Sequence, residues 1–101
     1  MFAATGNLYD FVWKWGSQGS GNGQFSTPID VAVDGSGYVY VVDSGNSRVQ
    51  EFTSTGVFLS KWGSFGSGDG QFSSPVGIVV DHLGDIYVSE FGNDRIQKFG
   101  Y

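Results

Sequence analysis

The feature that most constrains this chain is an internal repeat. Shifting the 101-residue sequence by 47 positions aligns residues 14–54 with residues 61–101, and 22 of the 41 aligned pairs are identical. A period of about 40–50 residues is typical of β-propeller blades, in which each repeat is one structural unit that stacks on its neighbours. The chain is therefore predicted to contain two copies of one small unit.

The composition favours strands over helices. Seventeen residues are glycine, well above the average of about 7%, and the strong helix formers Leu, Ala, Glu and Lys are scarce. Aromatic residues make up 17% of the chain, and β-branched residues are common. The chain has no cysteine, which excludes disulfides and thiolate sites. With 40% hydrophobic residues the chain can bury a core, which disfavours disorder.

Each copy contains a succession of short strand-like segments separated by glycine-containing turns. The expected strands of the first copy cover residues 29–34, 38–42, 49–52 and 57–62. Those of the second copy cover residues 76–81, 85–89 and 96–99. Near the N-terminus, residues 10–16 resemble the fourth strand, because F-V-W-K-W-G matches F-L-S-K-W-G. Four antiparallel strands without a helix are typical of a propeller blade.

Both copies also carry one long motif, at residues 28–52 and 75–99. It reads P-x-[G/D]-[V/I]-x-V-D-x-x-G-x-[V/I]-Y-V-x-[D/E]-x-x-N-x-R-[V/I]-Q-x-F. This motif resembles the NHL repeat, and the resemblance covers nearly the whole chain. It implies a β-propeller, most often of six blades, that serves as a binding platform. Two positions depart from the family pattern, because Asp30 replaces a glycine and Glu90 replaces an aspartate.

Two blades by themselves would leave two hydrophobic faces in water. The order of segments is an outer strand at 10–16, a complete blade at 28–63, and a blade at 75–101 that lacks its outer strand. We therefore expect residues 10–16 of one chain to complete the second blade of the next, closing a six-bladed homotrimer. Rings of two or four chains are geometric alternatives. A natural short protein, an excised fragment and a designed assembly fit this pattern equally well.

A polar motif, D/E-x-x-N-x-R, recurs in the two copies. Its members are Asp43, Asn46 and Arg48 in the first copy, and Glu90, Asn93 and Arg95 in the second. Asparagine tolerates the left-handed conformation of tight turns, and an arginine can pair with a carboxylate in a bidentate fashion. Because a single ligand site seldom needs the same residues in every repeat, these residues are predicted to hold a structural turn.

Three residues that differ between the copies are the candidates for ligand binding. Phe65 and Phe91 stand where the first copy has Gln18 and Ser44, in loops expected at one end of the propeller. Packing between adjacent loops is the alternative for both. Asp30 is expected near the axis of a ring, where three carboxylates could hold a hard cation such as Ca²⁺. Solvated carboxylates, or a bond to a neighbouring backbone, are the alternatives for Asp30.

The predicted function is a non-enzymatic, self-assembling scaffold that binds a peptide or protein at its loop face, without a cofactor. An NHL-like metal-dependent lyase or hydrolase is one alternative, but it would need several histidines where this chain has only His82. An RNA-binding NHL module is another, and the formal net charge of −5 disfavours it because nucleic-acid binding depends on Lys and Arg. No apolar run approaches the roughly 20 residues of a membrane helix, so no membrane partner is expected.

Overall fold

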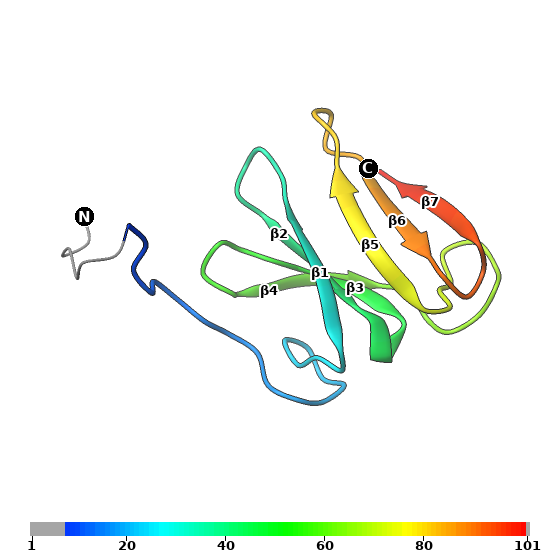
Figure 1. The fold of residues 1–101 in the computed structure, drawn as a ribbon, viewed down its shortest axis with the longest axis horizontal. Helices are drawn as coiled ribbons and strands as arrows, with labels where there is room; N and C mark the ends of the chain where they lie inside the picture. The colour runs from blue at the N-terminus through cyan, green and yellow to red at the C-terminus, as the bar shows by residue number, and fades with distance from the viewer. Residues whose placement is uncertain (1–7, 101) are drawn as a thin grey trace.

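The computed structural model describes residues 8–100, which fold into two antiparallel β-sheets lying side by side (Figure 1). The first sheet has four strands in chain order, β1 (Pro28–Val33), β2 (Val39–Asp43), β3 (Arg48–Phe52) and β4 (Phe58–Trp62). The second sheet has three, β5 (Pro75–Val80), β6 (Ile86–Glu90) and β7 (Arg95–Phe99). The predicted all-β architecture of two antiparallel sheets is confirmed, and the sheets have the strand order of propeller blades.

The strand ends differ by about one residue from the prediction. The segments expected at 29–34 and 76–81 each begin and end one residue earlier, as β1 and β5. Asp34 is not a strand residue because its Oδ1 accepts hydrogen bonds from the backbone N–H groups of Ser36 (2.9 Å) and Tyr38 (3.0 Å), which makes it part of the turn. Asp81 holds the matching turn of the second sheet in the same way.

The turn between β2 and β3 contains a short 3-10 helix, η1 (Ser44–Asn46). It ends at Ser47, whose φ of 52° lies in the left-handed region, and Asp94 has φ 51° at the matching place in the second sheet. Short polar side chains tolerate this conformation better than bulky ones do. The tight turn brings the start of β3 beside the end of β2, where the polar motif lies.

The main hydrophobic core lies between the two sheets. Its buried members are Tyr40, Val42 and Val49 from the first sheet, and Phe72, Ile78, Ile86 and Val88 from the second sheet and the loop before it. The rings of Trp62 and Phe99 complete it, with centroids 5.5 Å apart. Burial of these side chains stabilises the contact between sheets by roughly 1.5–3 kcal/mol for each large residue.

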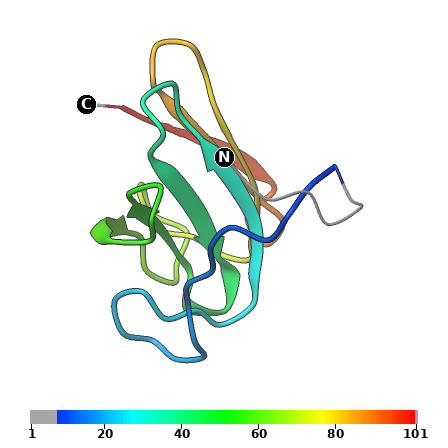
Figure 2. The same cartoon turned by 90° about the vertical axis from the view of Figure 1, so that its left-hand side faces the viewer.

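A second, smaller cluster lies on the opposite face of the first sheet. It consists of Val39, Val41 and Phe52, with Trp15, Phe25 and Phe58 packed against them. The N-terminal segment runs along this side of the sheet, away from the second sheet (Figures 1 and 2). Trp13 Nε1 donates a hydrogen bond to the carbonyl of Thr55 (2.7 Å), which holds the segment in place. Residues 8–16 form no strand within the described chain, so the strand expected at 10–16 is not formed there.

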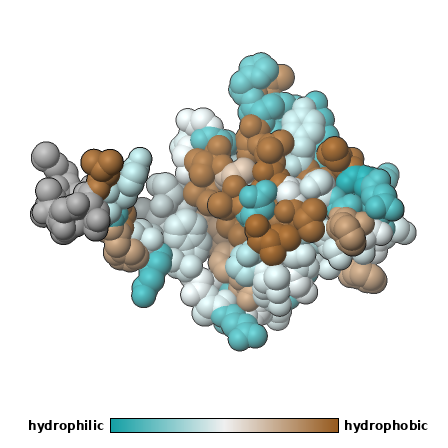
Figure 3. Space-filling view, viewed as in Figure 1, coloured by the Kyte–Doolittle hydropathy of each residue, from teal (hydrophilic) through white to brown (hydrophobic). Residues whose placement is uncertain are grey.

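Hydrophobic side chains remain exposed on both outward faces of this pair of sheets. In the view of Figure 3 they gather over β1 and β5. Val31 is 56% exposed, Val79 is 61% exposed and Ile96 is 70% exposed. Contiguous apolar surface of this kind marks an interaction site in a folded protein. Within residues 8–100, none of the structure is a helix that could cross a membrane.

Candidate functional site

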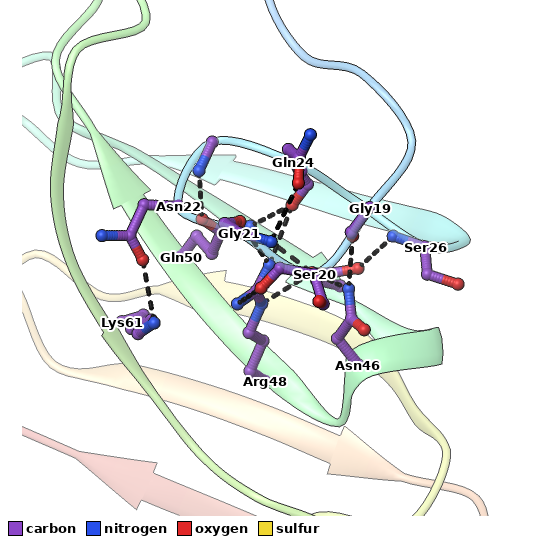
Figure 4. Close-up of polar contacts among 12 residues, drawn as sticks. Gly19, Ser20, Gly21, Asn22, Gln24, Ser26, Asn46, Arg48, Gln50 and Lys61 are labelled. Atoms are coloured by element: carbon purple, nitrogen blue, oxygen red, sulfur yellow. Dashed lines mark hydrogen bonds and ion pairs between the residues drawn. The ribbon is translucent and has the colours of Figure 1, made fainter.

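The polar motif of the first copy lies beneath the loop of residues 16–27, which folds back over β3 (Figure 4). Arg48 Nε donates to Asp43 Oδ2 at 2.7 Å. Its two Nη groups donate to three loop carbonyls, those of Ser20, Gly21 and Gln24, each at 2.9 Å. Arg48 therefore pairs with Asp43 as expected, but through one contact and not in a bidentate fashion. The loop carbonyls have no strand partner, so the guanidinium satisfies them instead.

Asn46 and Gln50 complete this network from either side of Arg48. Asn46 Nδ2 donates to Asp43 Oδ2 (2.9 Å) and to the carbonyl of Gly19 (3.0 Å). Gln50 Nε2 donates to the carbonyl of Gln24 (2.7 Å), and its Oε1 accepts from the N–H of Gly23 (2.9 Å). These polar groups hydrogen-bond to one another and to the loop backbone, so their role is to anchor the loop on the sheet.

The second copy repeats the network with Glu90 in place of the aspartate. Arg95 Nε donates to Glu90 Oε2 at 2.7 Å, and Asn93 Nδ2 donates to Glu90 Oε1 at 2.7 Å. Burial by itself would raise the pKa of Glu90. Hydrogen bonds from Arg95, Asn93, Gln97 and the Ser73 N–H outweigh it and hold the pKa of this carboxyl below its ordinary value.

Asp30 connects the two innermost strands of the sheets. Its Oδ2 accepts from the backbone N–H of Ile78 on β5 (2.9 Å), and its Oδ1 accepts from the N–H of Val31 (2.9 Å). Both oxygens thus have backbone partners, which favours the structural interpretation over a cation site. Among residues 8–100, no three His, Cys, Asp or Glu side chains lie close enough together to hold a metal ion.

Phe65 and Phe91 lie on neighbouring loops at one end of the second sheet. Each is 77% exposed. The two loops are joined by hydrogen bonds from the N–H of Phe91 to the carbonyl of Ser74 (2.9 Å) and from Asn93 Nδ2 to the carbonyl of Gly66 (3.0 Å). The side chains therefore offer apolar surface at the loop end. His82 is an exposed residue of the β5–β6 turn.

Sequence reasoning missed a cavity of about 260 Å³ between the sheets, lined in part by Tyr40, Glu51, Trp62 and Phe99. The Tyr40 hydroxyl lies 3.0 Å from Asp34 Oδ2 and 3.1 Å from Glu51 Oε2. Burial and these two carboxylates raise the pKa of Tyr40 well above its usual range. The cavity has no local signal in the sequence, because its walls come from both repeats.

The sheet topology and the repeated loop anchor lead to a family assignment. The sequence model of the NHL repeat family matches residues 25–52 and 72–99, which together are more than half of the chain. The chain belongs to the NHL repeat family. Each match runs from the end of the long loop to the end of the third strand of its sheet, β3 or β7, so it contains the D/E-x-x-N-x-R motif of its copy.

Curated relatives share this NHL region. The chain is 54% identical over 47 residues to the E3 ubiquitin-protein ligase TRIM71 of Rattus norvegicus, which covers 46% of the chain and 6% of that protein. It is 41% identical over 58 residues to Protein lin-41 of Caenorhabditis elegans, covering 57% of the chain and 5% of that protein. It is 41% identical over 49 residues to NHL repeat-containing protein 3 of Homo sapiens, covering 48% of the chain and 14% of that protein. The chain thus corresponds to a small part of each relative.

Proposed function

We propose that this chain is a non-enzymatic propeller subunit that associates with copies of itself into a six-bladed homotrimer and binds a peptide or protein at its loop end. One observation carries the first half of the proposal. The two outward faces hold, at matching repeat positions, the same kinds of residues that form the core between the two sheets within the chain. A face of the second sheet on one copy can therefore pack on the first sheet of the next copy.

The outward face of the second sheet matches the inner face of the first. Val79, Tyr87 and Ile96 lie 47 residues after Ala32, Tyr40 and Val49, which pack against the second sheet within the chain. The opposite face of the first sheet matches in the same way. Each residue of this face lies 47 positions before a residue of the core between the sheets. The pairs are Val31 and Ile78, Val33 and Val80, Val39 and Ile86, Val41 and Val88, and Phe52 and Phe99. Joining the two faces would bury side chains that are exposed in the single chain, Val31 and Val33 on one face and Val79 and Ile96 on the other, which favours association.

The position of the N-terminal segment supports the same arrangement. The Trp15 ring lies 5.7 Å from the Phe52 ring, and the Trp62 ring lies 5.5 Å from the Phe99 ring at the matching contact. Trp62 belongs to β4, the outer strand of the first sheet. This matching contact supports residues 10–16 as the outer strand of a preceding blade. What they lack is a strand to pair with, and the free edge of β7 in a second copy supplies it.

The mass of the 101-residue chain in solution tests the assembly. Native mass spectrometry and light scattering should both report about 33 kDa, for three chains of 10.9 kDa. Rings of two or four chains would give about 22 or 44 kDa and would overturn the six-bladed ring while keeping self-association. A stable monomer near 10.9 kDa would contradict self-association altogether.

The binding half of the proposal rests on Phe65 and Phe91. Aromatic residues are enriched in protein–protein interfaces, and these two lie on neighbouring loops anchored by the Arg95 network. The first copy has polar residues, Gln18 and Ser44, at the same positions. A trimer would therefore present three aromatic pairs at one end, alternating with three polar ones. This pattern fits an apolar peptide segment or a partner with a small hydrophobic protrusion.

Selection from a displayed random-peptide library tests this surface. Peptides enriched by the chain should bind the Phe65→Gln/Phe91→Ser variant at least about tenfold more weakly, since each truncated interface aromatic costs more than 1 kcal/mol. Both substitutions install the residue that the first copy already carries, so the loops keep their hydrogen bonds. Unchanged binding by the variant, or no enriched peptide at all, would contradict a loop-end site.

A further inference from the structure

A hydrogen bond inside the first blade indicates how two copies would recognise each other. Lys61 lies on β4 opposite Gln50 of β3, and its Nζ donates to Asn22 Oδ1 at 2.8 Å (Figure 4). Asn22 lies at the tip of the loop that folds over this sheet. The contact therefore ties the outer strand of a blade to the long loop of the same blade.

The second blade has the same loop but a charged residue at its tip. Asp69 lies 47 positions after Asn22, and it is exposed. The loop conformation is the same, because Gly70 N donates to Gln97 Oε1 at 2.9 Å as Gly23 N donates to Gln50 Oε1 at 2.9 Å. Asp69 thus has the same place relative to β7 that Asn22 has relative to β3.

The residue that matches Lys61 is Lys14, 47 positions earlier in the N-terminal segment. It stands in the same K-W-G sequence, and its side chain is exposed. Within one chain Lys14 lies on the far side of the first sheet, because the neighbouring Trp15 packs on Phe52 there. Asp69 belongs to the loop before β5 in the second sheet. Lys14 and Asp69 are therefore positioned to meet only between different copies.

We propose that Lys14 of one copy forms an ion pair with Asp69 of the next, and that this pair selects the register in which the N-terminal segment pairs with β7. The inference rests on the self-association proposed above. In this register Lys14 lies opposite Gln97, as Lys61 lies opposite Gln50 within the chain. Side chains alternate between the two faces of a sheet. A shift by one residue would therefore turn the hydrophobic residues of the segment to the wrong face.

The same register places Trp13 opposite Lys98. Within the chain the matching pair is Ser60 and Glu51, which are cross-strand partners joined by a 2.8 Å hydrogen bond. Lys98 already lies over an aromatic ring, with its Nζ 5.3 Å from the centroid of Tyr87. An indole opposite the ammonium group would give it a second aromatic face, and tryptophan is the most favourable ring for such a contact.

The Lys61–Asn22 contact within the chain and the proposed Lys14–Asp69 contact between copies differ for a physical reason. The internal lysine meets a neutral amide, and the covalent chain already brings the two together. A contact between copies must also select its partner, and opposite charges give both a stronger hydrogen bond and selectivity. The ion pair should therefore matter more for association than the matching amide contact matters for folding.

Charge reversal in the complete chain tests this pair. Lys14→Glu and Asp69→Lys should each weaken trimer formation, measured by sedimentation equilibrium over a dilution series in low salt. Exposed ion pairs change affinity by roughly 1.5- to 5-fold, and a closed trimer repeats the contact three times, so the combined association constant should fall by about 3- to 150-fold. The double variant Lys14→Glu/Asp69→Lys should recover the wild-type constant to within about threefold.

A matched control uses the internal lysine. Lys61→Glu changes the net charge as Lys14→Glu does, and it should leave the association constant nearly unchanged. Lys61→Glu/Asp69→Lys has the net charge of the wild type without the matched pair, and it should stay as weak as Asp69→Lys alone. If neither single reversal weakens the trimer, or if the double variant fails to restore the wild-type association constant, the ion pair alone is overturned. A monomeric wild-type chain would overturn self-association as well.

Discussion

β3 and β7 occupy the same position in the two repeats and have nearly the same sequence, R-V-Q-E-F and R-I-Q-K-F. All five residues of β3 are buried, whereas β7 alternates between half-buried and exposed. Val49 is fully buried and Ile96, its counterpart, is 70% exposed. The difference comes from what surrounds each strand, because β4 pairs with the edge of β3 and the second sheet covers its face.

This contrast teaches that the sequence of an NHL blade does not itself decide what the blade buries. A hydrophobic position in a blade is a core residue only if the next blade is present. The association proposed above would cover the exposed face of β7 and pair its edge. Substitutions at matching positions of the two copies separate the covered surface from the uncovered one.

The largest effect is expected from removing Phe72, which is fully buried between the sheets. Phe72→Ala should lower the free energy of unfolding by about 3–5 kcal/mol, since it leaves a cavity in the main core. Phe25→Ala, at the matching position, should lower the free energy of unfolding of the monomer clearly less. The measurement is made on protein diluted until it is monomeric. Urea unfolding monitored by tryptophan fluorescence measures both. Equal losses in the monomer would mean that the two faces do not differ in burial.

Loss of the guanidinium of Arg48 comes next. Arg48→Ala removes the charged partner of the buried Asp43 carboxylate and one donor from each of three loop carbonyls, and should cost about 3 kcal/mol of folding stability. Arg95→Ala should cost less, because the Arg95 side chain is 28% exposed against 8% for Arg48. Thermal unfolding of both variants at one protein concentration compares them. An unchanged melting temperature for Arg48→Ala would contradict the structural role of this network.

Ile96 and Val49 should show opposite responses to truncation. Ile96→Ala should weaken association by about 2 kcal/mol per contact between copies, while changing the unfolding of the separate chain by less than about 0.5 kcal/mol. Val49→Ala should instead lower the stability of the chain itself. Sedimentation equilibrium and urea unfolding together separate the two effects. An Ile96→Ala protein that assembles like the wild type would place β7 outside any contact.

The smallest effect is a change in the pH dependence of stability. Because the folded-state pKa of Glu90 lies below its ordinary value of 4.5, its contribution is complete above that pH. The contribution is lost as the pH falls through the folded-state pKa. Glu90→Gln should therefore flatten the loss of stability below about pH 4.5, as measured by urea unfolding at a series of pH values. Phe91→Ser, in the same turn, is the control and should keep the wild-type slope.

Much of the fold follows from local sequence. The repeat, the alternation of hydrophobic residues and the turn residues predict the seven strands of the two sheets and their order, because these signals act within a few residues. The further strand expected at residues 10–16 is not formed within the described chain. The strand ends and the arginine geometry were missed for one reason. Side chains of Asp34 and Arg48 bond to backbone groups that local patterns leave unassigned, and the partners of Arg48 lie 24 to 28 residues away.

What the sequence determined by itself is the repeating unit: two sheets of the NHL type, each with the same loop anchor. Only the tertiary structure decided which copy of each hydrophobic position is buried, that Asp30 joins the inner strands, and that Trp15 packs on Phe52. The physical reason is that burial and long-range hydrogen bonds depend on neighbours in space. The two similar repeats have different neighbours. The first lies between the N-terminal segment and the second sheet, whereas the second has one face uncovered.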